Sequence, residues 1–116
     1  MKKFLLLIFL SVFFSQANSA SMVKSFNGPG EFSLSQNYPN PFNPVTSISF
    51  SIPEDSFVSI KVYNLLGNQV ATVINKEIEA GQHSIKFDAS SLPSGVYFYM
   101  LKADNNVATK KLVLLK

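Results

Sequence analysis

Apolar and polar residues alternate along most of the chain after residue 45. In residues 46–52, isoleucine and phenylalanine alternate with serine. A period of two is typical of a β-strand with one face in a core and the other in water. Comparable apolar segments follow at residues 58–63, 69–74, 82–87, 96–103 and 107–115. The pattern therefore predicts six strands, or seven if the proline-rich segment before them also lies along a sheet.

Short segments rich in turn-forming residues separate these strands. Residues 53–56 reverse the chain, so we expect strands 46–52 and 58–63 to pair as an antiparallel hairpin. In the sequence Asn-Leu-Leu-Gly, Asn64 suits the first position of a type I turn. Gly67 suits the left-handed position that closes such a turn. Regular turns of this kind favour an antiparallel arrangement.

Many short strands with no helical repeat after the first twenty residues predict an all-β fold. We expect an antiparallel immunoglobulin-like β-sandwich of six to seven strands, with a small barrel as the alternative. Alternation assigns the following residues to the core: Phe42, Ile48, Phe50, Ile60, Val62, Ile85, Phe87, Leu92, Val96, Phe98 and Leu112.

The first twenty residues have the three regions of a secretory signal peptide. Lys2 and Lys3 give a positive start, residues 4–14 are apolar, and residues 15–20 are small or polar. The apolar region is shorter than the roughly 20 residues that span a bilayer as a helix. We therefore expect residues 1–20 to be a signal peptide cleaved after export to the periplasm. We expect residues 21–33 to be a short linker without room for a cargo domain, and residues 34–116 to be one domain.

Composition argues against nucleic-acid binding and against disulfides. The chain has no cysteine, and its net charge of +3 comes from ten lysines without any arginine. Removal of residues 1–20 takes away Lys2 and Lys3, which leaves eight lysines against seven acids. Arginine is the usual donor for bidentate contacts to phosphates and bases, so we expect no nucleic-acid partner. We also expect a monomer with no stable membrane insertion.

The residues that catalysis would require are sparse. His83 is the one histidine, and it lies in a predicted strand. A nucleophilic triad would need this histidine beside a serine and a carboxylate. Two pairs of acids lie in or beside short loops, where solvated charges are the simpler interpretation: Glu54 with Asp55 and Glu77 with Glu79. We expect no enzyme activity.

The chain also contains residues that could suggest a calcium site or a sugar-binding site. Calcium would need oxygen ligands beyond Asp88 and Asp104, and no acid-dense loop supplies them, so we expect no metal and no cofactor. Tyr63, Tyr97 and Tyr99 suit either an aromatic platform for sugars or cross-strand packing on the second face of a sheet. We favour packing, because the chain lacks tryptophan.

A proline-rich segment precedes the first clear strand. Proline lacks a backbone N–H and biases the residue before it away from helix. The three prolines at positions 39, 41 and 44 therefore predict an extended segment along a sheet edge.

Three separated motifs resemble one known family. The first is the segment of Tyr38, Pro39, Asn40, Pro41, Phe42, Asn43 and Pro44; the second is residues 92–98, which include Gly95 and Tyr97; and the third is the terminal run with Lys110, Lys111 and Lys116. Residues 62–67 resemble the family's first hairpin. Over residues 32–116 the chain thus resembles the type A C-terminal sorting domain of the type IX secretion system of Bacteroidetes-like bacteria.

The resemblance implies binding by the outer-membrane type IX secretion machinery and a final location outside the cell or on its surface. Family members commonly lose the domain after export, and their cargo is attached to surface lipopolysaccharide. The motif residues named above are the candidate sorting signals. Unpaired edge groups of the terminal strand are the candidate handle for the machinery. A small secreted immunoglobulin-like binding module for glycan or protein is the alternative.

Overall fold

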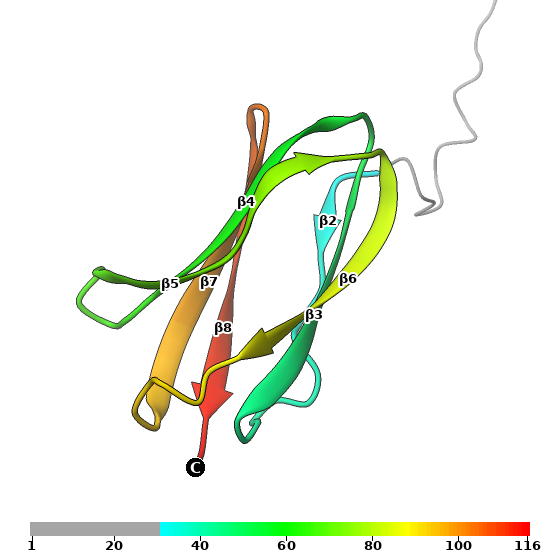
Figure 1. Cartoon of the computed structure of the whole chain (residues 1–116). Helices are drawn as coiled ribbons and strands as arrows, with labels where there is room; N and C mark the ends of the chain where they lie inside the picture. The colour runs from blue at the N-terminus through cyan, green and yellow to red at the C-terminus, as the bar shows by residue number, and fades with distance from the viewer. Residues whose placement is uncertain (1–30) are drawn as a thin grey trace, which may run out of the picture.

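The computed structural model describes residues 31–116, which fold into two antiparallel sheets packed face to face (Figure 1). One sheet has the order β2-β3-β6 and consists of β2 (Ser33–Leu34), β3 (Val45–Ile52) and β6 (Gly81–Asp88). The other has the order β5-β4-β7-β8 and consists of β4 (Ser56–Tyr63), β5 (Gln69–Ile78), β7 (Gly95–Ala103) and β8 (Asn106–Leu114). The all-β antiparallel sandwich is confirmed, with seven strands. The predicted signal peptide and most of the predicted linker lie outside the described residues.

The predicted hairpin between the first two long strands is wrong. β3 pairs with β2 and β6, whereas β4 pairs with β5 and β7. Both are central strands, each in a different sheet, and the chain crosses between the sheets after Ile52. Alternation reports which side chains face the core, but it does not report which strand lies alongside. The immunoglobulin-like classification stays a prediction.

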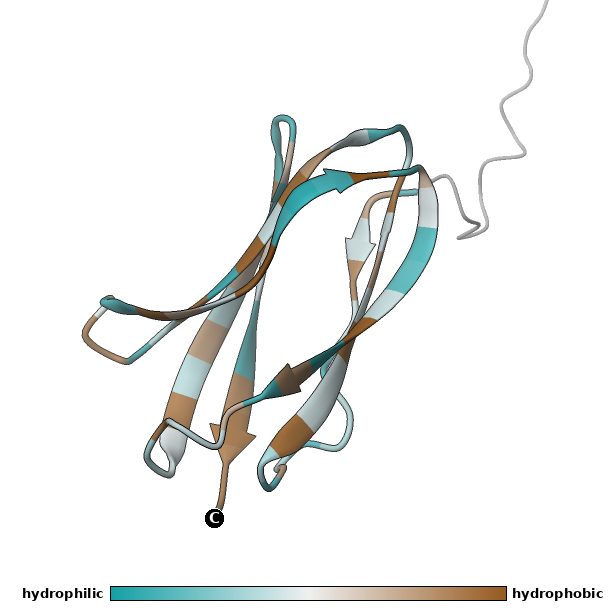
Figure 2. Ribbon diagram, in the orientation of Figure 1, coloured by the Kyte–Doolittle hydropathy of each residue, from teal (hydrophilic) through white to brown (hydrophobic). Residues whose placement is uncertain are grey.

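The core lies between the sheets and follows the alternation closely in β3 and β4. Ile48, Phe50 and Ile52 of β3 belong to the same core cluster as Val58, Ile60 and Val62 of β4, and all six are at most 3% exposed. Figure 2 shows apolar and polar residues alternating along these ribbons. Burying one such side chain stabilises a fold by about 1.5–3 kcal/mol. Other buried residues that the sequence analysis did not assign to the core include Leu34, Ile74, Ala89, Ala103 and Leu114.

The prediction for β7 is wrong about which face is buried. Tyr97, Tyr99 and Leu101 face the core, while Phe98 is 37% exposed and Val96 is half-buried. β7 is apolar on both faces, so its periodicity contains no polar face that marks the solvent side. Both tyrosines also find backbone partners for their hydroxyl groups, which removes the usual cost of burying them.

The structure also tests the core assignment of Ile85 and Leu92 and the predicted turn at residues 64–67. Ile85 and Leu92 are half-buried and pack against the core rather than lying inside it. The turn at residues 64–67 is confirmed: Asn64 Oδ1 accepts hydrogen bonds from the N–H groups of Leu66 and Asn68, both 3.0 Å long. Gly67 has a φ of 88°, the left-handed conformation expected of it.

Candidate functional site

The proline-rich segment is a compact loop, not an extended edge strand. Tyr38 forms an isolated antiparallel bridge with Ser47, and Phe42 forms an isolated parallel bridge with Leu114. Bends occupy the positions around these bridges, and the peptide bonds before all three prolines are cis. The segment bends instead of running as one extended strand, although Phe42 does lie along the free edge of β8 as expected. Proline limits its own φ and the residue before it, but contacts elsewhere decide the path of the loop.

A buried pair of polar side chains supplies those contacts. Asn37 and Thr46 are only 2% and 1% exposed. Asn37 Nδ2 donates to Thr46 Oγ1 over 2.9 Å and to the Pro39 carbonyl oxygen over 3.1 Å. The Thr46 hydroxyl donates to the same carbonyl over 2.9 Å. The sequence analysis missed both residues, because nothing in one sequence marks a polar side chain beside a loop as buried.

The Tyr99 hydroxyl ties the start of this loop to the other sheet. It accepts a hydrogen bond from the Asn37 N–H over 2.8 Å and donates one to the Ser35 carbonyl over 2.7 Å. Burial raises the pKa of Tyr99 to about 12, although the bond from Asn37 acts in the opposite direction. The phenol is therefore neutral at physiological pH and acts as both donor and acceptor.

The tyrosines do not form a sugar-binding platform. Tyr97 and Tyr99 face the core, and Tyr63 lies on the outer face of the same sheet. The favoured interpretation, packing on the second face of the sheet, is also wrong for Tyr97 and Tyr99, because their face is the core face.

Phe42 joins the loop to the end of β8. Its side chain is 2% exposed, and its ring centroid lies 6.4 Å from that of Phe87. The Phe42 N–H donates to the Val113 carbonyl, and the Phe42 carbonyl accepts from the Leu115 N–H, each over 3.0 Å. Asn40 Oδ1 accepts from the Val113 N–H over 3.0 Å. The terminal strand was expected to expose unpaired edge groups, but at Val113 and Leu115 the loop occupies them.

The second motif meets the third beside this loop. Gly95 lies opposite Leu114 in the β7–β8 ladder. The buried Tyr97 donates its hydroxyl hydrogen to the Pro93 carbonyl over 2.6 Å, which holds the turn that precedes β7. The start of β7 is thus fixed against the end of β8.

Lys116 also contacts the turn between β6 and β7. Its backbone N–H donates to Ser94 Oγ over 2.9 Å, and its Nζ donates to the Ser90 carbonyl over 2.7 Å. Asp88 Oδ1 accepts from the Ser90 N–H over 2.9 Å in the same turn. The hydrogen bonds from the backbone and the side chain of Ser90 hold the pKa of Asp88 below its usual value. Hydrogen bonds therefore link Lys116 to the turn between β6 and β7.

These contacts bring most of the candidate sorting residues to one end of the sandwich (Figure 1). We call this region the loop end and define it as residues 38–44, Gly95 and residues 115–116. Tyr38 is 80% exposed there, whereas Phe42 is buried. Tyr97 lies beneath the loop end, in the core. Lys110 and Lys111 lie farther along β8 and are exposed.

The residues considered for catalysis or metal binding lie apart. The His83 ring stacks on Phe50 with centroids 5.4 Å apart, and its Nε2 lies 2.6 Å from the Glu79 carbonyl oxygen. Asp88 ends β6 beside the loop end, and Asp104 lies in the β7–β8 turn at the other end of the sandwich. Among residues 31–116, no three acidic or histidine side chains cluster as metal ligands.

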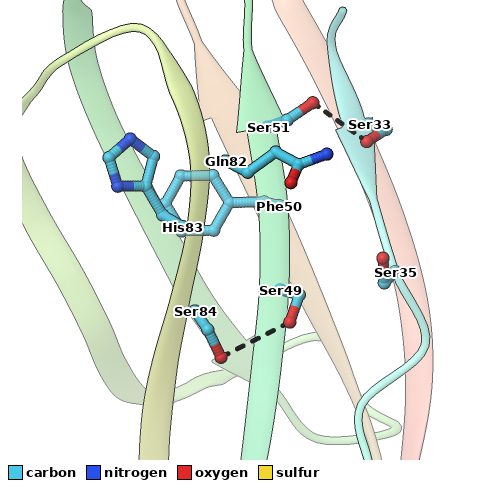
Figure 3. A pocket seen from close by; sticks show the side chains of 8 residues that line it. All are labelled: Ser33, Ser35, Ser49, Phe50, Ser51, Gln82, His83 and Ser84. Carbon is cyan, nitrogen blue, oxygen red and sulfur yellow. Dashed lines mark hydrogen bonds between the residues drawn. The ribbon is translucent and has the colours of Figure 1, made fainter. Parts of the chain in front are cut away.

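A shallow depression of about 430 Å³ lies on the sheet β2-β3-β6 (Figure 3). Ser33 Oγ lies 3.2 Å from Ser51 Oγ, and Ser49 Oγ donates to Ser84 Oγ over 3.4 Å. Hydroxyl groups that bond to one another need an acid or base to become nucleophiles. The lining residues offer only His83, which alternates with Ser84 and so points to the other face of β6. This arrangement gives no support for catalysis.

In the part of the chain that the structure describes, no helix has the length and apolar character needed to cross a membrane.

Comparison with protein families decides the assignment. The family model for the secretion system C-terminal sorting domain matches residues 36–115, most of the chain. The chain belongs to this family. Members of this family are C-terminal sorting domains of type IX secretion, so membership supports a role in secretion sorting. The matched residues include the whole loop of residues 38–44. They also include β7 and β8, which lie beside this loop at the loop end.

Among solved structures, one match is to PorZ of Porphyromonas gingivalis, described as an essential bacterial surface component of the type IX secretion system. The two are 16% identical with a TM-score of 0.45, and the match covers 86% of this chain. The chain spans 13% of that protein's length. No curated protein sequence matches the chain.

Proposed function

We propose that the sandwich is a non-enzymatic sorting domain that the outer-membrane type IX secretion machinery recognises for export across the outer membrane. The observation that carries the proposal is the convergence of three motifs, far apart in sequence, on the loop end. A signal peptide at residues 1–20 would first bring the chain to the periplasm. Export would then leave it secreted or on the cell surface.

The motif residues divide into two groups by exposure. Phe42 and Tyr97 are 2% and 5% exposed, so their contribution is to hold the loop end in shape. Tyr38 is 80% exposed, and the loop residues that follow it are largely exposed as well. Tyrosine is one of the residues that most often dominate binding at protein interfaces. Tyr38 is therefore our first candidate for direct contact with the machinery.

The alternative of a glycan-binding module receives less support. The sequence supported a glycan-binding module only through a possible aromatic platform of three tyrosines. Two of those three side chains are buried in the core. No other feature of the described residues favours it over sorting.

The test is export of a periplasmic reporter fused to residues 31–116 in a strain with an active type IX system. We expect the fusion to reach the medium or the cell surface, and a strain that lacks the system to retain it. Retention in the competent strain, while one of its own cargo proteins is secreted normally, would refute the sorting function.

Substitutions at the loop end test recognition itself. We expect Tyr38→Ala to lower export at least tenfold, since loss of one interface anchor costs more than about 1.4 kcal/mol. Phe57→Ala is the matched control, because Phe57 is 51% exposed at the other end of the sandwich.

The double reversal Lys111→Glu with Lys116→Glu should also lower export. Deletion of residues 111–116 is a poor variant, because it removes two fully buried leucines.

A further inference from the structure

The outer edge of β8 is covered along only half of its length. β8 is the last strand in the order β5-β4-β7-β8, so its ladder uses one edge and leaves the other free for other partners. Near the C-terminus these partners come from the segment before β3. Gln36 Nε2 donates to the Lys111 carbonyl over 2.6 Å, and Phe42 bonds with Val113 and Leu115. Beyond the Lys111 carbonyl, toward Val107, no hydrogen bond from this segment reaches the outer edge, although β2 lies close to β8.

The backbone groups that point outward along this open half can be assigned. Val113 bonds to the loop through both its N–H and its carbonyl, so both groups point away from β7. In an antiparallel ladder such residues recur at every second position. The β7–β8 register is continuous from Gly95 opposite Leu114 to Ala103 opposite Asn106. The N–H groups of Lys111, Thr109 and Val107 therefore point outward too.

These groups are accessible to a partner. Val107 is 54% exposed, and Thr109 and Lys111 are also exposed. Among residues 31–116, no partner for the outward N–H groups of Val107, Thr109 or Lys111 is present. An edge with unpaired N–H and C=O groups is a template for one more strand.

Charge selects which strand fits. Lys110 and Lys111 are exposed on the open edge strand, and Lys102, also exposed, lies opposite Val107 in the ladder. β7 and β8 contain no aspartate or glutamate. Pairing β8 with a second copy of itself would bring these lysines together, which is unfavourable. A strand that carries carboxylates would gain attraction instead.

We propose that the open edge of β8, residues 107–111, is the docking site for an extended acidic segment of a partner protein. The segment adds to the sheet as a fifth strand beside β8, with main-chain hydrogen bonds to Val107 and Thr109 and to the N–H of Lys111, whose carbonyl already accepts from Gln36. Carboxylates at alternate positions share one face of the added strand, and on the outer face of the sheet they lie beside Lys111. The inference rests on the proposed function only in naming the source of the segment, a protein of the export machinery.

The first test measures strand addition directly. The full chain, labelled with ¹⁵N, is titrated with the peptide Thr-Val-Glu-Val-Glu-Val-Thr and, separately, with its lysine counterpart. We expect the acidic peptide to shift the amide resonances of Val107, Thr109 and Lys111 and to slow their hydrogen exchange. Its affinity should exceed that of the lysine peptide at least tenfold and should fall as salt is added. Equal affinity, or shifts elsewhere only, would overturn the proposal.

A matched pair of variants separates the edge from the fold. Thr109→Pro removes an outward N–H without removing a ladder bond, a position at which edge strands accept proline. Thr109→Val changes the same side chain and keeps that N–H. We expect both to melt within a few degrees of the native chain, and only Thr109→Pro to lose peptide binding and at least tenfold of reporter export.

Three other results of these experiments would each contradict part of the proposal. Peptide binding and export by Thr109→Pro at the level of Thr109→Val would show that the edge is not used. Dimerisation of the native chain in sedimentation, abolished by Thr109→Pro, would assign the edge to a second copy and overturn the acidic partner. Peptide binding by a native chain that is not exported would refute the sorting function and leave the edge as a binding site for another acidic partner.

Discussion

Replacement of Tyr99 by phenylalanine tests the contact that joins the loop to the core. The ring is fully buried, and the change removes only its hydroxyl group. That group satisfies the Asn37 N–H and the Ser35 carbonyl at once. Since the ring stays, the effect of the variant measures these two hydrogen bonds rather than a cavity.

The expected loss of stability follows from the surroundings of each partner. Asn37 is 2% exposed, so its N–H is left without a partner, at a cost of about 1–3 kcal/mol. Ser35 is exposed, so its carbonyl can bond to water and loses about 0.5–1.5 kcal/mol. The sum is about 1.5–4.5 kcal/mol, a large part of the roughly 5–15 kcal/mol that stabilises a typical domain.

The assay is thermal and urea unfolding, followed by circular dichroism. One kcal/mol shifts the Tm of a domain of this size by about 4–8 °C, so we expect the variant to melt at least about 6 °C lower. Tyr63→Phe removes a hydroxyl from the outer face of the same sheet and should leave Tm nearly unchanged.

Alkaline pH gives a second signature of the same contact. The pKa of Tyr99 is about 12 in the fold, above its usual value of 10.0. Because the folded pKa is the higher one, its stabilisation is complete below pH 10 and is lost as pH rises toward 12. The Tyr99→Phe protein should lack this loss, and Tyr63→Phe should keep it. A Tm drop below 2 °C together with an unchanged alkaline profile would refute our account of the contact.

Further predictions concern the core, the β6–β7 turn and the N-terminus. Phe50→Ala should cost about 3–5 kcal/mol in urea unfolding, and an unchanged transition would show that this face is not packed. The Asp88 carboxylate, with its lowered pKa, stabilises the fold above about pH 4, and this part is lost as pH falls through the folded value. Asp88→Asn should therefore flatten the acid limb of the stability profile. Intact mass of the exported protein should show cleavage between Ser19 and Ser21, and a product that keeps residues 1–14 would contradict the signal peptide.

The sequence was sufficient for the fold class because β3 and β4 alternate cleanly. Serines mark the solvent face of β3, and the apolar residues between them are buried as expected. β7 has no such marker, and its buried and exposed faces were predicted in reverse. Tyr99 was expected to pack on the second face of the sheet, yet its hydroxyl has two backbone partners that only the tertiary structure brings to it.

The motifs of the candidate site could be recognised in the sequence, but their position next to one another in the fold could not. Residues 38–44 and the terminal run were recognised separately, and no local rule brings Phe42 beside Leu114. Their contact depends on the β7–β8 ladder, on the position of β3 in the other sheet and on the buried pair Asn37 and Thr46. Phe42 and Leu114 themselves lie more than sixty positions apart, so a single sequence contains no periodic signal for their contact.

If the proposed function holds, the loop of residues 38–44 has two roles that mutation must keep apart. Through Phe42 it completes the core and covers the end of the β8 edge; through Tyr38 it offers an exposed aromatic ring to a partner. A variant such as Phe42→Ala would lose export because the domain unfolds, and it would say nothing about recognition. Export must therefore be compared with Tm for every motif variant. Those that lose export at an unchanged Tm identify the surface that the secretion machinery contacts.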